Sequence, residues 1–315
     1  MSQVSSAGWF EPVLKFFDND RRMAVLARAG DPDRIEWARL TPFFLMHLGC
    51  LGVIWTGTSW FAVGLCVVLY ALRMFAITAF YHRLFSHRSY HAPRWVMFAG
   101  ALLGNASAQR GPLWWAAHHR KHHRHSDTDE DAHSPVCNSF LYAHMLWFAT
   151  RKHFPTDTAQ IPDLVQYPEL RWLDRYDAVV PLLLLLSLYG LGELLAVTAP
   201  SLGTSGFQLV VWGFCISTTL LFHATATVNS LAHRMGRRRF QTKDDSRNSL
   251  FIALITFGEG WHNNHHYAPG SVRQGFRWWE IDMSFYALKA MSWLGMVGRM
   301  NPIPERAQGT ASNRS

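Results

Sequence analysis

Four long apolar segments constrain the fold of this chain more than any other feature of its sequence. They cover approximately residues 40–55, 60–81, 178–199 and 207–231. Each is near the roughly 20 residues that a helix needs to cross a bilayer. In lipid a single segment satisfies its own backbone hydrogen bonds only as a helix. Short turns at Thr56–Ser59 and Pro200–Gly206 join the segments in pairs, which predicts two helical hairpins.

Lys and Arg are distributed unevenly about these segments. Neither hairpin turn contains a basic residue, whereas the opposite ends carry many, including the cluster Arg234–Arg239. The positive-inside rule therefore places those ends, and both chain termini, in the cytoplasm. The net charge of +8 fits loops beside anionic lipid. No recognised binding module accompanies it, so we expect no nucleic-acid partner.

The remaining sequence sets the boundaries of the expected domain. Residues 1–39 are charged and lack the features of a signal peptide, so we expect a cytoplasmic lead-in. Residues 40–300 are predicted to form one all-α integral membrane domain, in which a cytoplasmic helical region caps four transmembrane helices. Residues 301–315 are expected to be a disordered tail.

Histidines are concentrated at the basic ends of the apolar segments. The pattern H-x-x-H-H occurs at His119–His123 and again at His262–His266, and its three histidines share one helix face. Nine imidazoles are too many for one ion, which indicates two metals. Imidazole binds Fe, Zn, Cu or Ni, so the ligand type leaves the metal open. The candidate ligands are His82, His87, His119, His122, His123, His233, His262, His265 and His266.

His82 and His87 pose a geometric problem. Positions five residues apart on an ideal α-helix are separated by roughly 140° around the helix axis. Both rings can therefore face one metal only if the helix unwinds locally. The alternative is that they reach different metals.

Three acids near the histidines are candidates to accept an N–H from a ligand ring: Asp127, Asp131 and Glu259. Each could equally be an ordinary surface carboxylate. Glu259-x-x-His262 matches half of the ferritin-like di-iron motif, but the further glutamates of that class are not found.

As a set, the motifs resemble those of membrane acyl desaturases of the stearoyl-CoA desaturase type. The resemblance covers roughly residues 40–290 and rests on His82–His87, His119–His123, Asn229–His233 and Gly258–His266. It implies two Fe²⁺ ions bound by the nine histidines, with Asn229 reaching one iron through water. It also implies a bent apolar tunnel for the acyl chain. One departure is His118, which stands where an acid is expected.

The resemblance implies O2-dependent desaturation of a saturated acyl chain. A cis double bond, Δ9 in this family, would be introduced into an acyl-CoA or a chain on another carrier. The short chain without a fused electron-transfer domain indicates a bacterial inner membrane. The two electrons must come from an external ferredoxin, rubredoxin or b-type cytochrome with its reductase, since no haem, flavin or iron–sulfur motif is present. Candidates to line the tunnel are Gln109, Trp114, Trp115 and Trp261, with bulk packing the alternative for each Trp.

Two other functions compete with this interpretation. A membrane di-iron hydroxylase of alkanes or fatty acids would use the same histidine motifs. A transporter would place ionisable residues near the bilayer midplane, where this chain has few. Among these, Arg73 is expected to snorkel or to pair helices. We expect structural roles for the other histidines, His47, His91, His125, His133, His144, His153 and His223.

Overall fold

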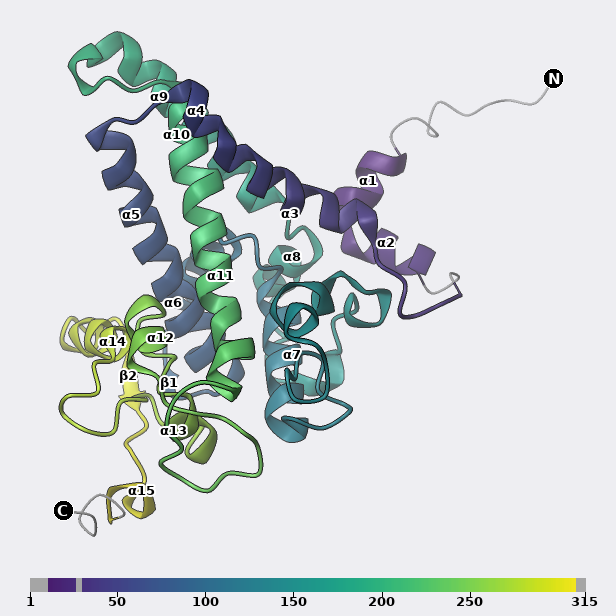
Figure 1. The fold of residues 1–315 in the computed structure, drawn as a ribbon, viewed down its shortest axis with the longest axis vertical. Coiled ribbons are helices and arrows are strands. Elements are labelled where there is room, and N and C mark those ends of the chain that lie inside the picture. Colours follow the sequence, from purple (N-terminus) through teal and green to yellow (C-terminus); the bar gives the residue numbers. More distant parts are fainter. Residues whose placement is uncertain (1–10, 27–29, 310–315) are drawn as a thin grey trace.

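The computed structural model describes residues 11–26 and 30–309, and this part of the chain is mostly helical (Figure 1). Four of its helices are long and apolar enough to cross a membrane, and each contains or nearly coincides with one of the apolar segments. They are Trp37–Thr56, Trp60–Ser86, Val179–Thr198 and Gly206–His233. One short antiparallel pair, β1 (Tyr90–His91) with β2 (Gly298–Met300), joins the end of the second candidate span to the C-terminal region.

Three of the four candidate spans change helix type along their length. The first consists of α3 (Trp37–Gly49), η2 (Cys50–Gly52) and α4 (Val53–Thr56). The second consists of α5 (Trp60–Phe75) and the π-helix η3 (Ala76–Ser86), and the third is α9 (Val179–Thr198). The fourth comprises α10 (Gly206–Leu209), π-helix η9 (Val210–Ile216), α11 (Ser217–Ser230) and η10 (Leu231–His233).

The hairpin turns are built from residues that end and begin helices. Gly57 and Gly203 adopt positive φ angles of 65° and 58°, which glycine reaches without steric cost. Ser59 and Ser205 then cap the following helices, because their hydroxyls accept hydrogen bonds from backbone N–H groups three residues on. The third span is followed by the short η8 (Pro200–Leu202).

The shorter helices gather mainly toward the end of the bundle that carries the histidines (Figure 1). The chain begins with α1 (Glu11–Phe17) and α2 (Asn19–Leu26). Between the second and third spans lie α6 (Arg94–Asn105), α7 (Pro112–His125), η4 (Tyr142–Leu146), η5 (Trp147–Ala149), η6 (Arg151–His153), η7 (Thr158–Gln160) and α8 (Pro168–Arg175). After the fourth span come α12 (Leu250–Ile255), α13 (His262–Tyr267), α14 (Met283–Trp293) and α15 (Glu305–Gly309).

Arg73 lies inside the second candidate span and ties it to its neighbours. Its side chain is fully buried and donates to the Thr218 and Ser217 hydroxyls, both at 2.7 Å, and to the Ala106 carbonyl at 3.1 Å. Of the two roles expected for Arg73, the structure therefore shows helix pairing. A buried charge needs such partners, because desolvation without them is costly.

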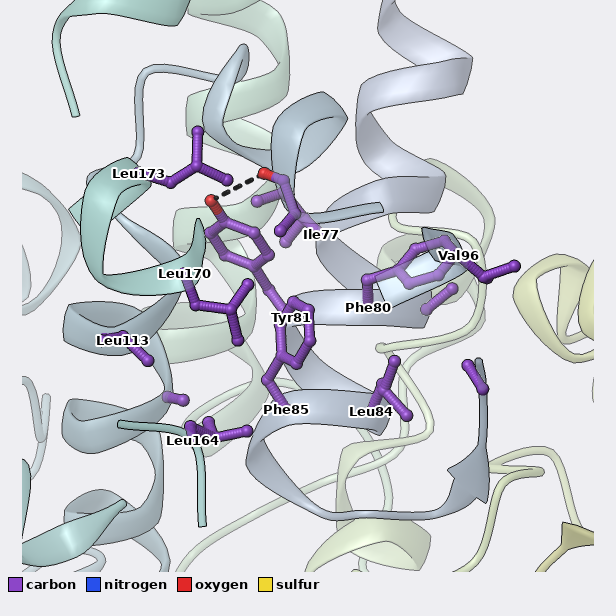
Figure 2. Packing of buried hydrophobic residues seen from close by; sticks show 14 of the residues in the cluster. Ile77, Phe80, Tyr81, Leu84, Phe85, Val96, Leu113, Leu164, Leu170 and Leu173 are labelled. Carbon is purple, nitrogen blue, oxygen red and sulfur yellow. Dashed lines mark hydrogen bonds between the residues drawn. The ribbon is translucent and has the colours of Figure 1, made fainter. Parts of the chain in front are cut away.

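The main hydrophobic core fixes the position of η3. Figure 2 shows Tyr81, Phe80 and Phe85 of this helix packed among side chains of α6, α7 and α8. The packing against α6 is close: a Cβ added at Gly104 would lie 2.3 Å from the ring of Tyr81. Because η3 also carries His82, this core holds one of the candidate ligands in place.

The expectation of a disordered tail from residue 301 is wrong for residues 301–309. Glu305–Gly309 forms α15, and the backbone N–H of Asn301 donates to the Ser89 carbonyl at 2.8 Å, next to the β1–β2 pair. The polar composition of this segment gave no indication of a long-range backbone pairing. Residues 310–315, and the start of the lead-in at 1–10, lie outside the described residues.

Candidate metal centre

The π-helix resolves the geometry of His82 and His87. A π-helix bonds residue i to i+5, so residues five apart lie nearly one turn apart on the same side. The bond from the His87 N–H to the His82 carbonyl is present at 3.2 Å, and the two ring centroids are 4.8 Å apart. Of the two alternatives, local widening of the helix therefore holds, and both rings belong to one group.

The nine histidines converge as two groups, within each of which the candidate ligand atoms lie within 4.8 Å of one another. The second candidate span supplies His82, and His87 follows its last residue. Helices α7 and α13 supply three rings each, and η10 supplies His233. The larger group contains His82, His87, His119, His123 and His265, and the smaller contains His122, His233, His262 and His266.

Imidazole nitrogens face one another in pairs at the spacing of ligands around a common ion. The Nε2–Nε2 distance is 2.8 Å for His87 and His119, and 3.0 Å for His233 and His262. Two nitrogens that each lie about 2.0–2.1 Å from one ion are about 3 Å apart when the nitrogen–metal–nitrogen angle is a right angle. The donor set therefore fits a pair of transition-metal ions, one for each group.

The pKa values of several of the rings agree with this fit. Burial, reinforced by neighbouring imidazoles, holds the pKa of His119, His123 and His265 well below its usual range. Neutral rings have a lone pair free for a metal. Burial also lowers the pKa of His266 to about 4, and its Nε2 is buried with no hydrogen-bond partner among the described residues.

Each of the three predicted acids lies against a candidate ligand. Asp127 Oδ2 is 2.8 Å from His233 Nδ1, and both oxygens of Asp131 are 3.0 Å from His122 Nδ1. Glu259 Oε2 is 2.5 Å from His82 Nδ1. A carboxylate in this position fixes the tautomer of the ring and directs its other nitrogen toward the metal.

Glu259 is itself held by charged and polar neighbours. The buried Arg83 lies 3.0 Å from both Glu259 Oε1 and Asp282 Oδ1. Gln274 Nε2 donates to Glu259 Oε2 at 3.0 Å and lies 3.2 Å from His82 Nδ1. The loop that carries Asp282 approaches so closely that a Cβ at Gly258, where φ is 123°, would lie 2.5 Å from its carboxylate.

The sequence analysis missed one acid of the same kind, Asp244. Its Oδ2 is 2.7 Å from His266 Nδ1, on the ring whose Nε2 is unpartnered. Asp244 lies shortly after the basic cluster and 22 residues before His266 in the sequence. No periodicity or motif marks it. Gln274 was missed for the same reason. His133, for which a structural role was expected, has its Nδ1 3.2 Å from Asp131 Oδ1.

A cavity of about 460 Å³ extends from the histidines into the bundle. Gln109, Trp114 and Trp115 line it, as do His119 and Asn229. Trp261 lies elsewhere, and its indole donates to the Ile281 carbonyl at 2.8 Å. The wall is largely apolar, which suits a hydrocarbon chain.

His118, the departure from the expected motif, also lines this cavity. Its ring lies 4.3 Å from that of Trp114, and Nδ1 is 3.0 Å from the Trp114 carbonyl. Burial lowers the pKa of His118 to about 3, so the ring is neutral. It packs against the cavity wall and lies outside both ligand groups.

Comparisons with known proteins agree with this site. The model of the fatty acid desaturase family matches residues 58–294. The chain is 35% identical over 287 residues to an sn-2 palmitoyl-lipid 9-desaturase of Nostoc, covering 89% of this chain and 95% of that protein. It is 34% identical over 267 residues to an sn-1 stearoyl-lipid 9-desaturase of Anabaena variabilis, covering 84% and 93%. Acyl-CoA 5-desaturase AL21 of Anemone leveillei is 36% identical over 256 residues, covering 80% and 75%.

The chain therefore belongs to the fatty acid desaturase family, and the family resemblance of its motifs is confirmed. Desaturases are oxidoreductases, and this protein is one. Its relatives include proteins named for acyl lipids and for acyl-CoA, so the comparisons leave the acyl carrier open.

Proposed function

We propose that this protein is an O2-dependent di-iron desaturase that introduces a cis double bond at the Δ9 position of a saturated acyl chain. The observation that carries the proposal is the convergence of nine histidines, in two groups, at a largely apolar cavity. The Δ9 position is supported by the names of the Nostoc and Anabaena relatives. Coenzyme A was the expected carrier, but the relatives differ in this respect, and the carrier is treated in the next subsection.

Two Fe²⁺ ions would be held by the two histidine groups, with Asn229 reaching one of them through water. Bound there, the irons would supply the activation of O2 and the removal of two hydrogens from adjacent methylenes. An imidazole-rich site is compatible with iron among other transition metals. The family resemblance favours iron over zinc.

The protein itself supplies orientation and a dry environment. Gln109, whose Nε2 donates to Thr225 Oγ1 at 3.1 Å, and the two neighbouring Trp residues shape the wall beside His119. A chain confined by this wall would present two adjacent carbons to the metals while excluding water. The carboxylates behind the ligand rings would hold them in place without contacting the substrate.

Electrons would come from an external carrier such as a ferredoxin, a rubredoxin or a b-type cytochrome with its reductase. We further propose that the histidine end of the bundle and both termini face the cytoplasm of a bacterial cell. The charge asymmetry of the sequence supports this orientation.

Fatty acid analysis in a desaturase-deficient host tests the proposal. Expression should produce a cis monounsaturated acid whose derivatised fragments place the double bond between C9 and C10. His123→Ala should abolish this product, whereas His91→Ala, which alters an exposed histidine outside both groups, should not. A hydroxylated chain would instead identify the hydroxylase alternative, which no structural observation favours.

A further inference from the structure

The cavity reaches the outer surface of two candidate membrane spans. From His119 and Asn229 its wall continues to Leu45 of α3 and Leu182 of α9. These two leucines are 59% and 39% exposed, although both line the cavity. Residues that are at once exposed and part of the wall form the rim of an opening. Figure 1 shows α3 running obliquely from α4 toward α1.

The opening lies along the first part of two candidate spans. Leu45 is eight residues from the start of its candidate span at Trp37, and Leu182 is three residues from the start at Val179. At 1.5 Å per residue these positions are about 12 Å and about 5 Å along their helices. Pro42, a third exposed residue of the wall, is also apolar and also lies on α3. The rim formed by these residues is therefore apolar and belongs to helices long and apolar enough to cross a membrane.

The basic side chains of the described cavity wall are already paired. Arg39 and Arg110 are the lysine or arginine residues of the described cavity wall, and both are bound to Asp177. Arg39 Nη2 donates to the two Asp177 oxygens at 2.7 and 2.8 Å, and Arg110 Nε is 2.7 Å from Oδ2. A nucleotide carrier with several phosphates needs uncommitted basic side chains. Both arginines of this wall are already paired with Asp177, near the ends of the spans.

Building on the proposed desaturase function, we propose that the acyl chain reaches the metals sideways from the bilayer, between α3 and α9. The substrate is then an acyl chain esterified to a membrane lipid, and acyl-CoA is excluded as the direct substrate. The lipid backbone would remain near the paired arginines at the membrane surface while its chain passes between Leu45 and Leu182 into the cavity.

Photolabelling in lipid nanodiscs tests this route without requiring turnover. The purified protein is reconstituted with phosphatidylcholine that carries a diazirine in a stearoyl chain, and separately with a diazirine-bearing stearoyl-CoA. After irradiation, mass spectrometry measures the label on Cys215 and Phe222, which line the cavity on the fourth span. The phosphatidylcholine probe should label them, and the stearoyl-CoA probe should not.

Matched substitutions locate the passage. Leu45→Trp and Leu182→Trp should each lower the labelling of the cavity by the phosphatidylcholine probe about tenfold, since the larger ring narrows a confined passage. Leu48→Trp and Leu183→Trp should leave labelling unchanged, because these neighbours are exposed but do not line the cavity.

Three results would overturn the inference: any labelling of the cavity by the stearoyl-CoA probe, no labelling by the phosphatidylcholine probe, or equal labelling in all four variants. None of them depends on activity. A protein labelled as expected that produces no unsaturated acid would count only against the proposed function.

Discussion

Replacement of Asp244 by Asn should weaken one of the two metal sites and leave the fold intact. Asp244 is 9% exposed, and its Oδ2 lies 2.7 Å from His266 Nδ1. Its other oxygen accepts hydrogen bonds from the Ser246 N–H and the Thr242 hydroxyl, both at 3.0 Å. An Asn side chain can keep these two contacts. It loses the negative charge that raises the basicity of the His266 ring.

The magnitude follows from the position of Asp244 behind a ligand. Loss of such a carboxylate costs about 10–100-fold in metal affinity, or about 1.4–2.7 kcal/mol. Only the smaller histidine group contains His266. The variant should therefore retain its first iron and lose the second at lower chelator concentrations than the wild type.

Iron per chain, measured by mass spectrometry during titration with a chelator, provides the assay. Asp245→Asn is the matched control, because the side chain of Asp245 is 44% exposed and pairs with Arg238. The control should retain both irons as the wild type does. Equal retention by Asp244→Asn, or equal loss from the control, would refute the assigned role of Asp244.

Three further predictions concern stability, each measured by thermal unfolding in detergent. Gly104→Ala should destabilise by about 1–3 kcal/mol, because its Cβ would meet Tyr81 at 2.3 Å, whereas Gly64→Ala, with open space around it, should not. Burial alone would raise the pKa of Asp177, but two bound arginines lower it below 3.8. The stability from this cluster is therefore complete above about pH 4 and lost as the pH falls further, so the melting temperature should fall as the pH is lowered below about 4, and should fall less in Asp177→Asn. Chelation should lower the melting temperature and Fe²⁺ should restore it, because a ligand that binds only the folded state stabilises that state by mass action. An unchanged melting temperature in Gly104→Ala, on acidification or on chelation would contradict the corresponding argument.

The sequence predicted well what depends on hydrophobicity and local spacing. Apolar length located the four candidate spans to within a few residues, because a helix in lipid needs a minimum number of apolar residues. The H-x-x-H-H spacing correctly marked the rings of α7 and α13 as candidate ligands, but each motif divides its three rings between the two groups and does not present them to one point. Asp127 and Asp131 could be nominated because they follow the central motif closely in sequence.

Features that depend on tertiary packing could not be predicted in this way. The widening of η3 brings His82 and His87 together. Their spacing in the sequence could not predict it, because that spacing was compatible both with one shared metal and with two different metals. Asp244 reaches His266 through a loop whose path only the folded chain defines. Trp261 was wrongly expected to line the tunnel. It lies next to a histidine motif in the sequence, but it is not part of the cavity wall.

Oxygen-isotope labelling of a turnover reaction tests the central claim most directly. The purified protein, loaded with Fe²⁺ and supplied with a reduced ferredoxin and saturated phosphatidylcholine, is exposed to ¹⁸O2, and the released fatty acids are analysed by mass spectrometry. A desaturase should yield a monounsaturated chain free of ¹⁸O, in amounts that depend on O2 and are lost in His123→Ala. Incorporation of ¹⁸O into a hydroxylated chain would contradict the account.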